Sequence, residues 1–182
     1  RSYSICARRG EALRVGIREV SGGRLSTWLV REVRAGDRIE VQPPSGSFHA
    51  DPQAGGRHLL IAAGSGITPM LSIAGSMLAN PTAEVTLIYA NRRSRTVMFT
   101  EELGDLKNSY GPRLDVMHVL SREPREAGMF SGRLNRGRLD EILDTVVPTD
   151  DIDQFWLCGP LSLVEEAEAA LAARGIGKDR IH

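Results

Sequence analysis

Apolar residues follow two different patterns in the two parts of the chain. From residue 53 onward, short apolar runs alternate with longer stretches in which apolar side chains recur at helical spacing. We expect strands at residues 58–63, 84–89, 114–120 and 154–157, and helices at residues 69–78, 98–106, 139–146 and 161–174. Strands and helices in such alternation form right-handed units around a parallel sheet. Residues 53–182 are therefore predicted to be a Rossmann-like α/β domain.

The first fifty residues combine strand patterns with turn residues. Val and Ile alternate or cluster in three segments that Gly or Pro separates. These predicted strands lie at residues 2–6, 12–20 and 38–42. Helical spacing from Leu25 to Val33 indicates one short amphipathic helix. Residues 1–52 are therefore predicted to be all-β with one helix, and the region is too small to be a complete barrel.

The charge balance and the cysteine content exclude several classes of protein. The 182 residues include 23 basic and 23 acidic side chains, so no overall field attracts nucleic acid or an anionic membrane. No apolar run is long enough to cross a bilayer. The only cysteines, Cys6 and Cys158, exclude a disulfide framework or a four-cysteine metal site, and we expect a cytoplasmic protein. Since the chain starts at Arg1 and ends at His182 in strand-like patterns, we interpret it as a fragment.

A glycine-rich turn follows the first predicted strand of the α/β domain. Gly64 and Gly66 separate this strand from a helix that carries Pro69 in its first turn. Glycine lets the backbone approach a ligand closely, and the free N–H groups of a helix start attract phosphate. With Ile67 and Thr68, these residues are predicted to form a pyrophosphate site, although Pro69 replaces the third glycine of the dinucleotide fingerprint. The alternative is a tight turn without a ligand.

Polar and glycine residues follow the other predicted strands as well. In a parallel sheet the carboxyl ends of the strands line one edge, where ligands bind. The residues at these ends are Asn91, Arg92 and Arg93, then Ser121 and Arg122, and finally Cys158, Gly159 and Pro160. We expect them to share one rim with the glycine turn. Cys158 would there border the meeting point of a nicotinamide and a flavin, or it would be a small buried apolar side chain.

The arginines of this rim suit a phosphate group. A guanidinium binds phosphate in a bidentate geometry, and the hydroxyl of Ser121 donates a further hydrogen bond. A 2′-phosphate on the adenosine ribose is the natural target, which favours NADPH over NADH. The alternative is that Arg92, Arg93 and Arg122 pair with surface carboxylates. The candidates for such pairs are Glu101, Asp105 and Glu123.

Five motifs, in this order, resemble those of the ferredoxin–NADP reductase superfamily. They are Arg1-Ser2-Tyr3-Ser4, Gly23-Arg24-Leu25-Ser26, Pro44-Ser45-Gly46-Ser47-Phe48, Gly64-Ser65-Gly66-Ile67-Thr68-Pro69 and Cys158-Gly159-Pro160. Together they cover essentially the whole chain. Residues 89–92 and 120–124 are in addition similar to the reductase components of bacterial multicomponent oxygenases, of the phenylacetyl-CoA epoxidase and ketosteroid 9α-hydroxylase types.

The resemblance implies that residues 1–52 are an N-terminally incomplete antiparallel β-barrel domain that binds FAD. Arg1 would neutralise the FAD pyrophosphate, and Tyr3 would stack on the isoalloxazine ring. Ser4 would form a hydrogen bond near flavin N5, the hydride acceptor. Backbone N–H groups at a helix start would hold the FAD phosphates, with Gly23, Leu25 and Ser26 at this site.

The resemblance further implies an FAD-dependent NAD(P)H oxidoreductase. The pyrophosphate of NADPH or NADH would lie at residues 64–69, and the nicotinamide would lie beside Cys158 and Gly159. Ser4 and Cys158 would border the hydride transfer, without a general acid or base. Single electrons would then pass to a 2Fe–2S centre, on a further C-terminal domain or on an oxygenase or ferredoxin-type partner. No metal ligands are expected within the chain itself.

Two other interpretations stay open. The chain is a stand-alone flavin reductase or the reductase half of a flavohaemoprotein, which needs no iron–sulfur domain. Otherwise it is a non-enzymatic nucleotide-binding module, and the flavin motif of residues 1–4 argues against this interpretation.

Overall fold

A parallel four-stranded sheet is the centre of the larger part of the chain. The computed structural model describes all residues from 1 to 182. The strands are β1 (Gly56–Ala63), β2 (Ala83–Asn91), β3 (Leu114–Leu120) and β4 (Gln154–Cys158). They pair in the order β3-β2-β1-β4, and every pairing is parallel. The structure thus confirms the predicted parallel sheet.

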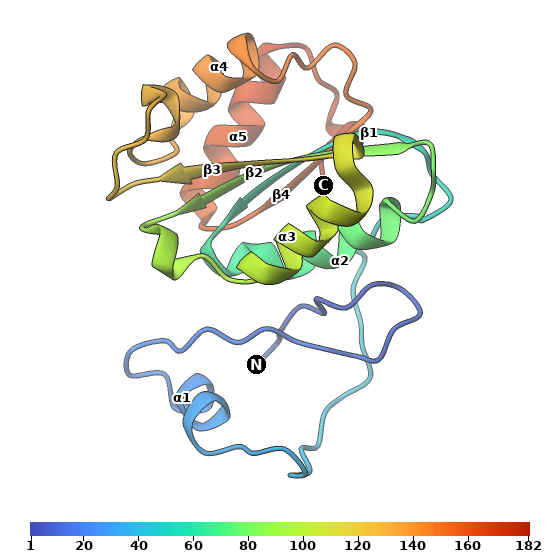
Figure 1. The fold of residues 1–182 in the computed structure, drawn as a ribbon, viewed down its shortest axis with the longest axis vertical. Helices are drawn as coiled ribbons and strands as arrows, with labels where there is room; N and C mark the ends of the chain where they lie inside the picture. Colours follow the sequence, from blue (N-terminus) through green and yellow to red (C-terminus); the bar gives the residue numbers. More distant parts are fainter.

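Helices cover both faces of this sheet (Figure 1). They are α2 (Ile67–Met77) and α3 (Thr100–Tyr110) on one face, and α4 (Arg136–Thr145) and α5 (Leu161–Ala173) on the other. Alternate residues of β1 supply two separate cores: Leu60 and Ala62 face α2 and α3, whereas Leu59 and Ile61 face α4 and α5. Burial on both faces explains why β1 is a continuous apolar run rather than an alternating one.

The predicted elements of the α/β domain are all present, with ends that differ by a few residues. Helix α4 begins three residues earlier than predicted because the side chain of Asn135 caps it, accepting a hydrogen bond from the Arg138 N–H at 3.1 Å. Helix α3 begins later, at Thr100, since Phe99 adopts a left-handed conformation with φ of 60°. The predicted strand at the chain end is reduced to one parallel bridge, between Ile181 and Phe155 of β4.

The predicted barrel strands are the main error of the sequence-based expectation. Between residues 1 and 55 the one regular element is α1 (Arg24–Arg31), which confirms the short amphipathic helix. The three segments expected to be strands contain a single antiparallel bridge, between Ile5 and Val15. A strand needs a hydrogen-bonded neighbour, and the segment around Val41, whose side chain is 81% exposed, has none.

The N-terminal part lies on the side of the sheet that α2 and α3 cover (Figure 1). Its best-buried residues are Cys6 and Ala7, with exposed fractions of 1% and 4%. Cys6 shares an apolar cluster with residues of α2 such as Ile73.

No helix of the structure has the length and apolar composition needed to cross a membrane.

Candidate functional site

The glycine turn lies between β1 and α2. Gly64 has a φ of 56°, which favours glycine, and residues 64–66 form a short 3-10 helix that leads directly into α2. No side chain caps either helical start, so the first N–H groups have no side-chain acceptor. The hydroxyl of Thr68 instead donates to the Ser65 carbonyl at 3.0 Å. The turn thus presents backbone donors and the positive end of a helix dipole to an anion.

The turn after β4 touches the glycine turn, backbone against backbone. A β-carbon on Gly66 would lie 2.2 Å from the Cys158 carbonyl oxygen and 3.1 Å from the Gly159 nitrogen. A β-carbon on Gly159 would lie 3.2 Å from the Ala63 side chain. Ala62 pairs with Cys158 in the sheet, which places the two strand ends at the same level. Side chains larger than hydrogen do not fit between these two turns.

The ends of β2 and β3 continue this rim. The Ser121 N–H donates to the Asn91 carbonyl at 2.9 Å, and the Arg122 N–H donates to the Arg92 carbonyl at 2.8 Å. These bonds extend the pairing of the two strands beyond their ends. Arg92 and Arg122 therefore lie on neighbouring strand ends, as expected for a common edge, and both are exposed.

The carboxylates that offered an alternative role for these arginines form no ion pair with them. Arg92, Arg93 and Arg122 form no ion pair in the structure. Glu123 instead accepts the Ser94 N–H at 3.0 Å, and this backbone hydrogen bond lowers the pKa of its carboxyl group. The Arg93 guanidinium donates to the Arg122 carbonyl at 3.2 Å. The charges of Arg92 and Arg122 consequently stay available to an anion.

Asn91 carries an unused amide at the end of β2. Asn91 is 8% exposed, and neither Nδ2 nor Oδ1 has a hydrogen-bond partner. An unpaired buried amide is unfavourable unless a ligand or water completes its bonds. Asn91 is thus a polar group suited to a ligand at the rim.

Tyr89 connects the glycine turn to the loop before α3, a role that the sequence analysis did not assign. Its buried hydroxyl donates to the Gly64 carbonyl at 2.9 Å and accepts the Met98 N–H at 3.3 Å. Burial raises the pKa of this phenol, so the hydroxyl keeps its proton at neutral pH. The only signal for this contact in the sequence is a tyrosine placed two residues before the end of β2, close to the edge where the glycine turn lies.

Replacing Tyr89 with Phe is expected to lower the free energy of unfolding by about 1 to 3 kcal/mol, because the Gly64 carbonyl and the Met98 N–H lose their shared partner. Urea unfolding of the two proteins measures this difference. Tyr110→Phe is the matched control, since the Tyr110 hydroxyl accepts only an exposed bond from Arg8. Equal stability of Tyr89→Phe and Tyr110→Phe would contradict the assigned connection.

Cys158 is half-buried at the end of β4, directly beside Gly66. Burial raises the pKa of its thiol. The side chain is therefore a neutral thiol at physiological pH and not a thiolate nucleophile. Pro160, which follows Gly159, is the N-cap residue of α5 and has no side-chain cap bond. The arrangement lets Cys158 border a bound ring without reacting with it.

The motif at the N-terminus is open to solvent. Arg1 and Ser4 are exposed and Tyr3 is half-buried, and their side chains form no hydrogen bond within the chain. They are thus free to contact a ligand.

The start of α1 offers a second group of free backbone donors. Its N-cap residue is Gly23, without a side-chain cap bond, and Leu25 lies in its first turn. The buried hydroxyl of Ser26 accepts the Val20 N–H at 3.1 Å and holds the preceding loop. A β-carbon on Gly23 would lie 2.6 Å from this hydroxyl. The Ser26 side chain is therefore committed to the loop, and the N–H groups of the helix start remain available.

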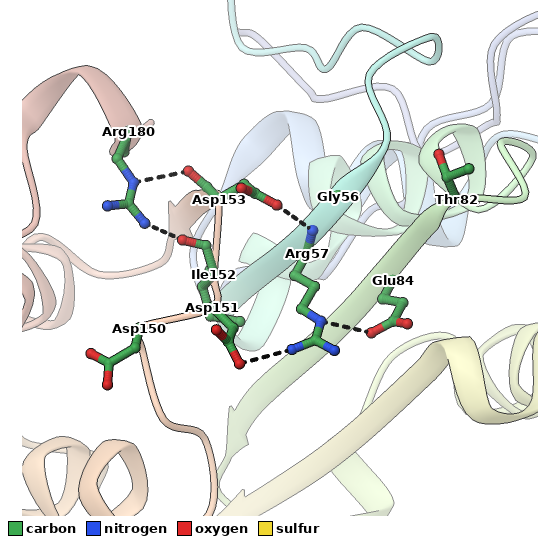
Figure 2. Close-up of a pocket in the computed structure, with 9 residues that line it drawn as sticks. All are labelled: Gly56, Arg57, Thr82, Glu84, Asp150, Asp151, Ile152, Asp153 and Arg180. Carbon is green, nitrogen blue, oxygen red and sulfur yellow. Dashed lines mark hydrogen bonds and ion pairs between the residues drawn. The ribbon is translucent and has the colours of Figure 1, made fainter.

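A hollow of about 800 Å³ lies at the opposite edge of the sheet, before the strands begin (Figure 2). Its carboxylates are Glu84, Asp150, Asp151 and Asp153. Arg57 pairs with Glu84 and Asp151 at 3.1 Å each, so its charge is already matched. This acidic lining repels a pyrophosphate, and we therefore place no nucleotide here.

A family model and several curated proteins match the chain in sequence. Residues 60–169 match the family described as oxidoreductase NAD-binding domain. A component of 1,2-phenylacetyl-CoA epoxidase from Escherichia coli (strain K12) is 38% identical over an alignment that covers 100% of this chain and 52% of that protein. The ferredoxin reductase component of 3-ketosteroid-9-alpha-monooxygenase from Mycobacterium tuberculosis is 36% identical, with coverages of 100% and 48%. The chain thus spans about half the length of these curated relatives.

Solved structures extend the similarity to both parts of the chain. The FAD/NAD-binding domain of nitric oxide dioxygenase from Vibrio cholerae superposes with a TM-score of 0.85 and 27% identity, covering 100% of this chain and 75% of that one. A cytochrome P450 reductase from Amycolatopsis superposes with a TM-score of 0.83 and 31% identity, with coverages of 99% and 54%. The N-terminal residues therefore belong to the shared architecture as well.

Proposed function

Because the chain belongs to the oxidoreductase NAD-binding domain family, we propose that it is the nucleotide-binding part of an FAD-dependent NAD(P)H oxidoreductase that supplies electrons to an oxygenase system. The observation that carries the proposal is the approach of Gly66 to the Cys158 carbonyl. It joins a phosphate-binding turn to a second glycine turn, at the edge of the sheet where dinucleotides bind.

The residues of the rim suit the two ends of a nicotinamide dinucleotide. The turn from Gly64 to Pro69 holds the pyrophosphate with backbone N–H groups, and the buried amide of Asn91 gains a partner. Cys158 and Gly159 border the nicotinamide, where the protonated thiol excludes water without attacking the ring. Arg92, Ser121 and Arg122 bind the 2′-phosphate, which makes NADPH the preferred donor over NADH.

Residues 1–52 contribute to the flavin site, and residues 53–182 form the nucleotide domain. The exposed cation of Arg1 and the uncapped start of α1 suit the FAD phosphates. The half-buried ring of Tyr3 offers an aromatic face, and Ser4 donates a hydrogen bond at the flavin edge. Bound FAD supplies the two-electron hydride acceptor that also releases single electrons. The chain's own residues bind and orient the two cofactors and exclude water from the site, and none of these residues is needed to move a proton.

The name of one relative supports an iron–sulfur acceptor, because it is the ferredoxin reductase component of a monooxygenase. Another relative is a component of an epoxidase. We place the 2Fe–2S centre on a part of the full protein outside residues 1–182 or on a separate partner. A flavohaemoprotein-type reductase is the second candidate, because flavohaemoproteins from Chromobacterium violaceum and Rhodopirellula baltica are both 32% identical to the chain.

Stopped-flow absorbance tests the proposed function. Full-length, FAD-loaded protein is mixed anaerobically with NADPH or, separately, with NADH. We expect the flavin absorbance to bleach with at least one of the two nucleotides. A flavin that neither nucleotide bleaches would leave a non-enzymatic nucleotide-binding module as the best account of the chain.

A further inference from the structure

A short hairpin follows the N-terminal motif directly. Ile5 and Val15 form an antiparallel bridge, and the Cys6 N–H donates to the Arg14 carbonyl at 2.8 Å. The turn between these residues contains Gly10 with a φ of 89°. Residues 5–15, called here the N-terminal hairpin, therefore have a defined shape although they belong to no regular sheet.

One face of helix α2 holds this hairpin. The Ser72 hydroxyl donates to the Ala7 carbonyl at 2.6 Å, and the Ser76 hydroxyl accepts the Arg9 N–H at 2.9 Å. Serines four residues apart on a helix lie on the same face. Between them, Gly75 makes room for Arg8: a β-carbon on Gly75 would lie 2.6 Å from Cγ and 2.8 Å from Cδ of that side chain.

Helix α3 adds two contacts to the same hairpin. The Arg8 guanidinium donates to the Tyr110 hydroxyl at 3.2 Å, and Arg14 pairs with Glu102 at 3.0 Å. Both contacts are exposed, so they stabilise the arrangement less than the burial of Cys6 does. The hairpin thus has its strongest attachment on α2.

Helix α2 is then a common support for two separate sites. Its start carries the glycine turn, and its later residues hold the hairpin that continues into Arg1-Ser2-Tyr3-Ser4. We propose that Ser72, Gly75 and Ser76 are positioning residues, which set the place of the N-terminal flavin motif relative to the nucleotide turn. This positioning role rests on the proposed function, because it assumes that a flavin and a nucleotide bind at these two places. The attachment of the hairpin itself is independent of it.

Hydrogen exchange of the hairpin tests the attachment without any catalytic readout. In full-length protein, Gly75→Ala is expected to raise amide exchange in residues 5–15, because the new methyl group displaces Arg8. Gly104→Ala is the matched control, since this helical glycine of α3 has no atom within 4 Å of an added β-carbon. Arg8→Ala combined with Gly75→Ala is expected to restore slow exchange by removing the displaced side chain. Unchanged exchange in Gly75→Ala, or failure of the rescue, would overturn the attachment.

Transient kinetics test the positioning role with the same variants. We expect the limiting rate of flavin reduction to fall about five- to tenfold in Gly75→Ala, because small displacements of reacting groups are costly. The dissociation constant of the oxidised nucleotide should stay within about twofold, since the start of α2 is unaltered. Ser76→Ala, which removes only the acceptor of the Arg9 N–H, is expected to raise exchange in the hairpin and to lower the reduction rate, both to a smaller extent than Gly75→Ala.

Failure of the proposed function and failure of the positioning role give different results. A wild-type flavin that no nucleotide reduces rejects the proposed function, while the exchange experiment still decides whether α2 holds the hairpin. A mobile hairpin with an unchanged reduction rate rejects the positioning role alone. A parallel loss of rate and nucleotide affinity in Gly75→Ala also rejects it, because the effect then passes through the nucleotide turn.

Discussion

Replacing Gly66 with alanine is expected to weaken nucleotide binding about 100-fold. The β-carbon would lie 2.2 Å from the Cys158 carbonyl oxygen and 2.6 Å from its carbonyl carbon, and both are backbone atoms that cannot rotate away. The turns after β1 and β4 must therefore separate. A 100-fold loss corresponds to about 2.8 kcal/mol, within the range of about 1 to 3 kcal/mol that overpacking costs. Isothermal titration of the full-length protein with oxidised nucleotide measures the effect.

Gly137→Ala serves as the control for this substitution. Gly137 lies in the first turn of α4, and an added β-carbon there meets no atom within 4 Å. The affinity of Gly137→Ala for the nucleotide should equal that of the wild type. If Gly66→Ala binds as tightly as Gly137→Ala, then the two turns do not form the pyrophosphate site.

Replacing Arg122 with alanine is expected to weaken NADPH binding about 10- to 100-fold and to leave NADH binding unchanged. The exposed guanidinium forms no ion pair and emerges beside Arg92, so its charge is free for a 2′-phosphate. A charge-assisted hydrogen bond of this kind contributes about 1.5 to 3 kcal/mol. Anaerobic stopped-flow reduction at varied concentrations of each nucleotide gives both affinities.

A lysine at this position separates charge from geometry. Arg122→Lys keeps the charge but loses the bidentate donors, so we expect an NADPH affinity between those of the wild type and Arg122→Ala. Ser121→Ala should cost less than Arg122→Ala, since a neutral hydroxyl contributes only about 0.5 to 1.5 kcal/mol. Equal losses for NADPH and NADH in Arg122→Ala would show that the arginine does not distinguish the two nucleotides.

The α/β domain was predictable because its signals are local. Buried parallel strands are short apolar runs, and residues 114–120 were predicted with the same ends that the structure has. The start of α3 was not predictable, since it depends on the distant Tyr89 hydroxyl, which holds the Met98 N–H, and on the left-handed Phe99. The barrel strands were predicted wrongly because alternation of apolar residues indicates a half-buried strand but not the neighbour with which it pairs.

The grouping of the rim residues was also predictable, for a reason of topology. Parallel strands end at one edge, so Gly64, Arg92, Arg122 and Cys158 had to lie along the same rim once the sheet was identified. The contact between Gly66 and Cys158 and the hydroxyl bonds of Tyr89 depend on the exact separation of atoms from different elements of the fold. Such separations are set by packing between distant segments, for which the sequence pattern contains no local signal.

Because β4 lies beside β1 in the sheet, β1 stays incompletely paired during much of its synthesis on the ribosome. β1 is made early, but one of its edges stays open until β4 is synthesised, after β2, β3 and four of the five helices. An open apolar strand edge invites pairing with other chains, so nascent or prematurely terminated polypeptides that lack residues 154–158 are expected to aggregate. The backbone contact between Gly66 and Cys158 also forms only at this late stage. Capture of a nucleotide at the proposed site therefore has to await the synthesis of β4.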